Sequence, residues 1–133
     1  MPYLQLDLPG RFPAAVKRAL AVRLCELYAS VMETQRWRPN VGIRELGEDN
    51  LLHLGPDGPE AMTLVMCDIR RGRSAAQRLA LAEGIVAACA DLLGVEQRGV
   101  LIEFTQHDGD EMYRAGGWVA DWDAAETAAS PAR

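Results

Sequence analysis

The spacing of apolar residues in the first half of the chain predicts a strand, a helix and a second strand. Leucines occupy every second position of residues 2–8, which is the period of a half-buried strand. From residue 13 to 31 the apolar spacing changes to three and four residues, which predicts an amphipathic helix packed on a sheet. Residues 41–46 predict the second strand. A unit of this kind has a right-handed crossover and parallel strands.

The second half of the chain repeats the same order of elements. Residues 62–69 are apolar on both faces, as a central strand is, and residues 100–104 predict the last main strand. Ser74 is a good N-cap for the helix between them, and Gly94 is placed to end that helix. Its buried stripe is expected to consist of Leu79, Ala82, Val86, Cys89 and Leu93.

The remaining segments carry weaker patterns. Residues 50–54 are compatible with a short extra strand, whereas residues 55–59 are rich enough in glycine and proline to predict a loop. Residues 105–122 lack a clear period. The tail at residues 124–133 is small and polar, so we expect it to fray.

The two halves match at a shift of about 60 residues, which places Pro2 over Met62. We therefore predict one α/β (α+β) domain over residues 1–133, with pseudo-repeats at 2–55 and 61–118. Two such βαβ units give a four-stranded sheet with two helices on one face, and we expect other subunits to cover the opposite face.

Composition narrows the classes of function. The chain has 133 residues and a formal net charge of −5, which argues against a general binder of nucleic acid or of membrane surfaces. We expect a cytoplasmic protein, since the sequence has neither a leader pattern nor a stretch long enough to span a bilayer. The cysteines, Cys25, Cys67 and Cys89, sit in apolar patterns and are expected to be buried hydrophobes.

Pro2 is the first candidate for chemistry. If Met1 is removed, the strand begins with a free secondary amine, which can act as a general base. The alternative is an ordinary strand-starting proline, because proline is tolerated at that position. A retained Met1 would turn the Pro2 nitrogen into an amide that is not basic.

A run of arginines follows the central strand. Arg70 and Arg73 are candidates for bidentate binding of a substrate carboxylate, and Arg71 is expected to face water. Their charge would also lower the pKa of a nearby amine. The alternative is a solvated turn whose arginines pair with acidic neighbours.

Further candidates for the site lie elsewhere in the chain. Arg114 and Tyr113 are candidates for an extra carboxylate ligand and a pocket wall, or else form a surface hairpin between subunits. Glu103 is either an acid or the partner of an arginine. His53 and His107 lack metal-ligand spacing, so we expect surface residues and no metal site.

Three features together resemble the tautomerase superfamily. They are Met1-Pro2 at the start of a strand, the Ile69–Ser74 turn, and the glycine-containing stretch from Tyr113 to Gly117. The doubled length and the arginine spacing look most like the cis-3-chloroacrylic acid dehalogenase group, with the malonate semialdehyde decarboxylase group close behind.

The resemblance implies a homotrimer of pseudo-hexameric βαβ units that works without a cofactor. It implies that Pro2 is the catalytic amine and that Arg70 and Arg73 bind the substrate carboxylate. The chain departs from the dehalogenase pattern: Tyr28 stands where that enzyme has a histidine, and Glu103 and Arg114 stand where it has its water-activating residues. These departures argue against dehalogenation and hydration.

The function expected from the sequence is a cofactor-independent tautomerase or isomerase that acts on a small 2-oxo or enol carboxylate. One alternative is a decarboxylase, hydratase or dehalogenase that uses the same proline as an acid. The other is a non-catalytic trimeric homologue that serves as a binding module.

Overall fold

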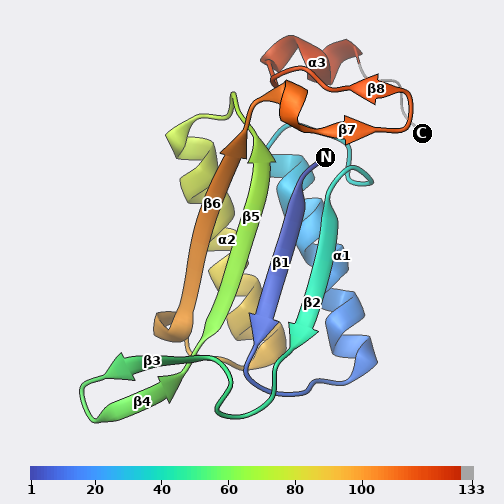
Figure 1. Cartoon of the computed structure of the whole chain (residues 1–133). Coiled ribbons are helices and arrows are strands. Elements are labelled where there is room, and N and C mark those ends of the chain that lie inside the picture. The colour runs from blue at the N-terminus through green and yellow to red at the C-terminus, as the bar shows by residue number, and fades with distance from the viewer. Residues whose placement is uncertain (130–133) are drawn as a thin grey trace.

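One four-stranded sheet organises the computed structural model, which describes residues 1–129 (Figure 1). Its order is β2-β1-β5-β6, with bounds Tyr3–Leu8 for β1, Asn40–Glu45 for β2, Thr63–Arg70 for β5 and Val100–His107 for β6. β1 is parallel to β2 and β5 is parallel to β6, whereas the central pair, β1 and β5, is antiparallel. The predicted pair of βαβ units is therefore confirmed, and the two units meet in opposite directions.

Two long helices cover one face of the sheet (Figure 1). α1 spans Ala14–Val31 and α2 spans Ala75–Leu93. The alternation predicted for β1 is confirmed, because every second side chain of the strand is buried beneath the helices. β5 was expected to be apolar on both faces, and it too buries every second side chain beneath the helices. The fully buried core residues on these four elements include Leu4, Leu6, Leu8, Leu20, Leu24, Val65, Cys67, Ile69, Leu81, Ile85 and Cys89.

The buried stripe of α2 is only partly the predicted one. Cys89 and Leu93 are buried as expected, but Leu79 is 60% exposed and Leu81 and Ile85 take its place in the core. α2 carries apolar residues around most of its circumference, so two different stripes both have spacings of three and four residues. The packing of α2 against α1, and not the spacing of its apolar residues, decides which of the two stripes is buried.

The ends of α2 are those predicted. The Ser74 side chain accepts a hydrogen bond from the Gln77 backbone N–H, and the Gln77 side chain accepts one from the Ser74 N–H, which completes a capping box. Gly94 follows the helix in the left-handed conformation, with φ of 68°.

The segment before β5 forms a hairpin. β3 spans Leu52–Gly55 and β4 spans Gly58–Ala61, so the prediction of a loop over residues 55–59 is wrong for Gly55, Gly58 and Pro59. Pro59 lies opposite Leu54 in a ribbon of two strands. Each strand of such a ribbon has a free edge, where the missing N–H of proline is tolerated.

The segment after β6 folds over the end of the sheet at which β1 begins (Figure 1). It contains the hairpin of β7 (Tyr113–Arg114) and β8 (Gly117–Trp118), followed by α3 (Ala124–Ala129). Short 3-10 helices at Gln97–Gly99 and Gly109–Glu111 flank β6. The first six residues of the tail that we expected to fray are thus helical, and the rest of it lies outside the described residues.

In the described part of the chain, no helix lies over the opposite face of the sheet (Figure 1). Its side chains are a mixture of apolar and polar residues: Tyr3, Gln5, Leu64, Met66, Leu101 and Glu103. Within residues 1–129, neither long helix combines the length and apolar character needed to cross a bilayer.

Candidate active site at the start of β1

A small pocket lies where the start of β1 meets the end of β5. Because these strands are antiparallel and Tyr3 pairs with Asp68, Pro2 lies beside the segment that carries Arg70. The pocket has a volume of about 20 Å³ and is lined by Met1, Pro2, Tyr28, Thr34, Arg38, Arg70, Arg73, Arg114 and Val119. The structure thus brings together five of the predicted site residues: Pro2, Tyr28, Arg70, Arg73 and Arg114.

Pro2 is buried and fixed to β2. Its carbonyl accepts hydrogen bonds from the Asn40 backbone N–H at 2.9 Å and from Asn40 Nδ2 at 3.3 Å. Met1 precedes it in the structure, so the Pro2 nitrogen is an amide here, and the terminal amine lies 3.8 Å from the sulfur of Met112.

The electrostatics of the site disfavour a protonated amine. The pKa of the Met1 amine falls from 8.0 to about 6, first because of burial and then because of the charges of Arg70, Arg114, Arg38 and Arg73. The amine is therefore mostly neutral at pH 7.

Arg70 and Arg38 hold a carboxylate of the chain itself. Arg70 Nη2 donates to both oxygens of Glu126, at 2.8 and 2.9 Å, and Arg38 Nη1 donates to Glu126 Oε1 at 2.7 Å. Burial acts to raise the pKa of Glu126, but the hydrogen bond from Arg70 and the charges of Arg70, Arg38 and Arg73 outweigh it and lower that pKa. Arg70 Nη1 also donates to the Ala120 carbonyl at 2.7 Å.

Arg73 is not the free side chain expected of a turn residue. It is only 5% exposed, and its Nε and Nη2 donate to the Met32 carbonyl at 3.2 and 3.1 Å, at the C-terminal end of α1. The guanidinium also lies 4.4 Å from the centroid of the Trp122 ring. Burial is the main cause that lowers the pKa of Arg73 to about 10. Arg73 lines the pocket, but its donors already serve the fold.

Tyr28 supplies a buried hydroxyl. It lies in α1 with its side chain fully buried, and in the described part of the chain its hydroxyl has no hydrogen-bond partner. Burial raises the pKa of Tyr28 to about 12, against the lowering effect of Arg73 and Arg70. The hydroxyl is therefore protonated near neutral pH and available to donate to a ligand in the pocket.

The other candidates lie further from the pocket. Tyr113 is 61% exposed, packs edge-on against Trp118 at 5.2 Å and lines a neighbouring hollow of about 270 Å³ that Met1 also lines. Glu103 lies opposite Met66 on the uncovered face of the sheet and does not line the pocket. The structure therefore does not bring Glu103 into the site.

Arg71 faces water as predicted, and its Nε donates to Asp108 at 2.6 Å. The two histidines are partly exposed and lie near carboxylates: His53 is 3.4 Å from Glu60, and His107 is 3.6 Å from Asp68 and from Glu111. Among residues 1–129, we find no cluster of three or more histidine, cysteine or acidic side chains arranged to hold a metal ion.

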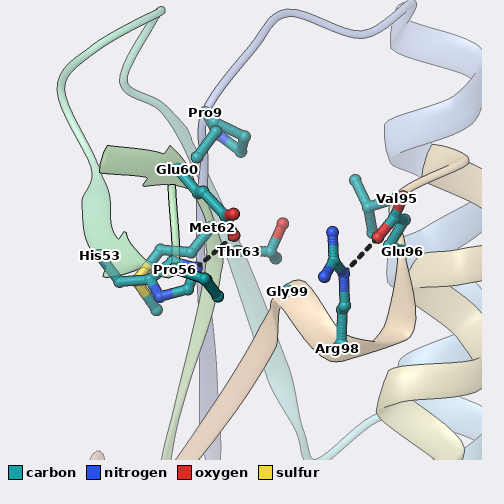
Figure 2. A pocket seen from close by; sticks show the side chains of 11 residues that line it. Pro9, His53, Pro56, Glu60, Met62, Thr63, Val95, Glu96, Arg98 and Gly99 are labelled. Carbon is teal, nitrogen blue, oxygen red and sulfur yellow. Dashed lines mark hydrogen bonds and ion pairs between the residues drawn. The ribbon is translucent and has the colours of Figure 1, made fainter. Parts of the chain in front are cut away.

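A larger cavity of about 400 Å³ lies at the opposite end of the sheet, where β5 begins (Figure 2). Met62 occupies there the place that Pro2 has before β1. The cavity's charged side chains are paired, His53 with Glu60 at 3.4 Å and Arg98 with Glu96 at 2.6 Å, as the dashed lines of Figure 2 show. Since Met62 is an internal residue, its backbone nitrogen is an amide and is not a candidate base.

Sequence reasoning missed Arg38, Thr34 and Glu126. The first two lie in the connection between α1 and β2, and Arg38 sits about 60 residues before Arg98, so the repeat could have drawn attention to it. Glu126 is the one acidic residue of an alanine-rich segment, and nothing in the local pattern distinguishes it.

Comparisons with known proteins support the fold. No family model matches the sequence, and no curated protein matches it either. Among solved structures, a member of the cis-3-chloroacrylic acid dehalogenase family has a TM-score of 0.82 and 23% identity over 97% of this chain and 92% of its own. A wild-type fused 4-OT that forms a symmetric trimer has a TM-score of 0.79 and 22% identity over 89% of this chain and 95% of its own.

The macrophage migration inhibitory factor of Toxoplasma gondii is also similar, with a TM-score of 0.73 and 18% identity over 87% of this chain and 98% of its own. At these identities the comparisons show the fold. The resemblance drawn from the sequence is thus confirmed at that level, and the chain has the fold of the tautomerase superfamily.

Proposed function

We propose that the protein is a cofactor-independent tautomerase or isomerase of a small 2-oxo or enol carboxylate, with Pro2 as its general base after removal of Met1. One observation carries the proposal: Pro2 lines the same pocket as Arg38, Arg70, Arg73 and Arg114. A positioned base can take a proton from a carbon next to a carbonyl, and nearby positive charge stabilises the enolate that forms.

The arginines favour Pro2 as a base over Pro2 as an acid. The Met1 amine already has its pKa lowered to about 6 by burial and by these cations. A Pro2 amine, one residue further into the same pocket, would experience the same two effects. Both effects favour the neutral form, which can accept a proton, whereas decarboxylation, hydration or dehalogenation with proline as the acid requires the protonated form.

The proposed reaction moves one proton. The neutral nitrogen of Pro2 takes a proton from the carbon next to the carbonyl, and the electron pair of the broken C–H bond moves onto the carbonyl oxygen. The buried hydroxyl of Tyr28 donates a hydrogen bond to that oxygen, and the arginine charges stabilise the enolate. The protonated Pro2 then returns the proton to a different atom of the substrate, which completes the isomerisation.

A homotrimer is part of the proposal. The uncovered sheet face carries Leu64, Met66 and Leu101, of which Leu101 is 48% exposed, and the fused 4-OT of similar fold is a symmetric trimer. The alternative of a non-catalytic trimeric homologue applies if Met1 stays on the chain, because Pro2 would then be an amide.

The test is deuterium exchange into the methyl group of pyruvate in D2O, followed by proton NMR. Met-free protein is expected to exchange the methyl protons well above the rate of the same protein with Met1 retained, with intact mass identifying each form. Equal rates for the two forms would overturn Pro2 as the base.

A further inference from the structure

Two arginines of the pocket already hold a carboxylate, and it belongs to the chain. Glu126 receives three hydrogen bonds from Arg70 and Arg38, between 2.7 and 2.9 Å long. Charge-assisted contacts of this length are those that a bound acid would make. Glu126 therefore marks where the site holds a carboxylate and which arginines hold it.

We propose that Arg38 and Arg70 form the carboxylate-binding subsite of the pocket, and that Glu126 on α3 occupies this subsite until a small monocarboxylic acid displaces it. The inference deepens the proposed function, on which it rests. It adds Arg38 as a ligand, and it makes α3 a competitor of the substrate.

Arg73 is a poorer ligand for the acid than its position in the sequence implies. Two of its nitrogens donate to the Met32 carbonyl, and its guanidinium is covered by Trp122. Turning Arg73 toward a ligand would leave the Met32 carbonyl buried without these donors. Arg38 and Arg70 need no such rearrangement, because they already hold a carboxylate.

The pocket is small beside the two arginines that hold Glu126. A volume of about 20 Å³ accommodates roughly one water molecule and no acid of three carbons. A substrate carboxylate that binds Arg38 and Arg70 must take over the hydrogen bonds of the Glu126 carboxylate.

The segment before α3 is anchored, so α3 can move alone. The Trp122 N–H donates to the Arg71 carbonyl at 3.1 Å, and the Trp122 ring lies over Arg73. Asp123 then begins the helix by accepting from the Ala125 N–H at 2.8 Å. A hinge at Asp123 would release Glu126 and leave Trp122 in place over Arg73.

Competition with Glu126 weakens the apparent affinity for an acid, because only the fraction of molecules with an open subsite can bind. Pyruvate titrations of the full chain, followed by NMR chemical shifts, measure this effect without turnover. Glu126→Gln should bind pyruvate roughly 10- to 100-fold more tightly than the wild type, the range expected for the loss of a charge-assisted contact. Arg38→Gln in the Glu126→Gln background should remove most of that gain. Arg36→Gln in the same background should not, because Arg36 is an exposed arginine that lies 3.7 Å from Glu26 and does not line the pocket.

Glu111→Gln is the matched control for charge. Glu111 lines the neighbouring hollow beside Met1 and contacts His107, so its loss changes the net charge near the site by the same amount. A gain in pyruvate affinity equal to that of Glu126→Gln would show a general field effect and overturn the proposal. No gain in Glu126→Gln would overturn it as well.

Hydrogen exchange of the wild type gives a second, mutation-free measurement. Saturating pyruvate should speed exchange of the amides of residues 124–129, and unchanged or greater protection there would overturn the displacement of α3. Failure of the proposed function looks different: tight pyruvate binding by Glu126→Gln without methyl exchange in Met-free protein would keep the subsite and refute the base.

Discussion

The guanidinium of Arg73 is held between Trp122, at 4.4 Å from the ring centroid, and the carbonyl of Met32, to which two of its nitrogens donate. It thereby ties the C-terminal end of α1 to the turn after β5 and to the segment that leads into α3. A residue that the sequence predicts as a substrate ligand thus cross-links three segments of the fold.

Arg73→Ala should destabilise the protein. The change removes two hydrogen bonds from a charged donor to the Met32 carbonyl and one cation–π contact with Trp122. We expect the free energy of unfolding to fall by roughly 2 kcal/mol. Urea unfolding measures it. Arg71→Ala is the control: its pair with Asp108 is about half exposed, so its loss should cost about 1 kcal/mol or less. Equal stability of Arg73→Ala and wild type would leave Arg73 with a ligand role alone.

Burial and the nearby arginines lower the pKa of the terminal amine of Met-retaining protein to about 6, and pH-dependent acylation of the amine should measure this shift. Because the folded pKa lies below the unfolded one of about 8, the unfolded chain binds more protons between these values, and stability should rise as pH increases through that window. Arg70→Ala should raise the amine pKa, and Arg98→Ala, at the other end of the sheet, should leave it unchanged.

Tyr28→Phe should separate catalysis from stability. The hydroxyl is buried without a described partner, so its removal should leave the melting temperature equal or slightly higher. Exchange of the pyruvate methyl protons should slow by roughly 10- to 100-fold if the hydroxyl stabilises the enolate. A large drop in melting temperature would instead indicate a structural contact for the hydroxyl.

Gly72→Ala should disturb the anchor of α3. Gly72 has φ of 124°, and a Cβ there would collide with the Trp122 carbonyl. We expect a loss of roughly 2 kcal/mol in thermal or urea unfolding and faster amide exchange in residues 124–129. Gly10→Ala, where a Cβ meets nothing within 4 Å, should change neither quantity appreciably.

Sedimentation should show three associated chains. Leu101→Lys, on the uncovered face of the sheet, should weaken association because it places a charge in the proposed interface. Val22→Lys, on the helix side and 57% exposed, is the control and should keep the trimer. A stable monomer at micromolar concentration would contradict the proposed assembly.

Local patterns predicted most of the fold because they coincide with its packing. The leucines of β1 alternate as the sheet requires, and Ser74 and Gly94 bound α2 through contacts within a few residues. The register between β1 and β5 could not be predicted from local patterns, since it depends on contacts between residues about 60 positions apart. Whether Leu81 or Leu79 is buried likewise depends on packing against α1. The spacing of apolar residues within α2 carries no information about that packing.

The site was predictable where the repeat or the arginine run marked it. Pro2, Arg70 and Arg114 line one pocket, as expected if these residues belong to the same site. Arg38 comes from a connection without a period, and Glu126 from a segment whose composition predicts fraying. Their role arises because separate segments lie close together in three dimensions, and a local sequence pattern does not show which distant segments meet.

The opposed directions of β1 and β5 make the two ends of this sheet chemically unequal. A polypeptide has one amino terminus, so a chain of two fused units can free an amine at the Pro2 end and never at the Met62 end. A chain of two fused units thus has half as many terminal amines per unit as two separate chains would have. Fusion also releases the first residue of the second unit from any demand for a base, and the paired charges around Met62 are compatible with an end of the sheet that is free to diverge.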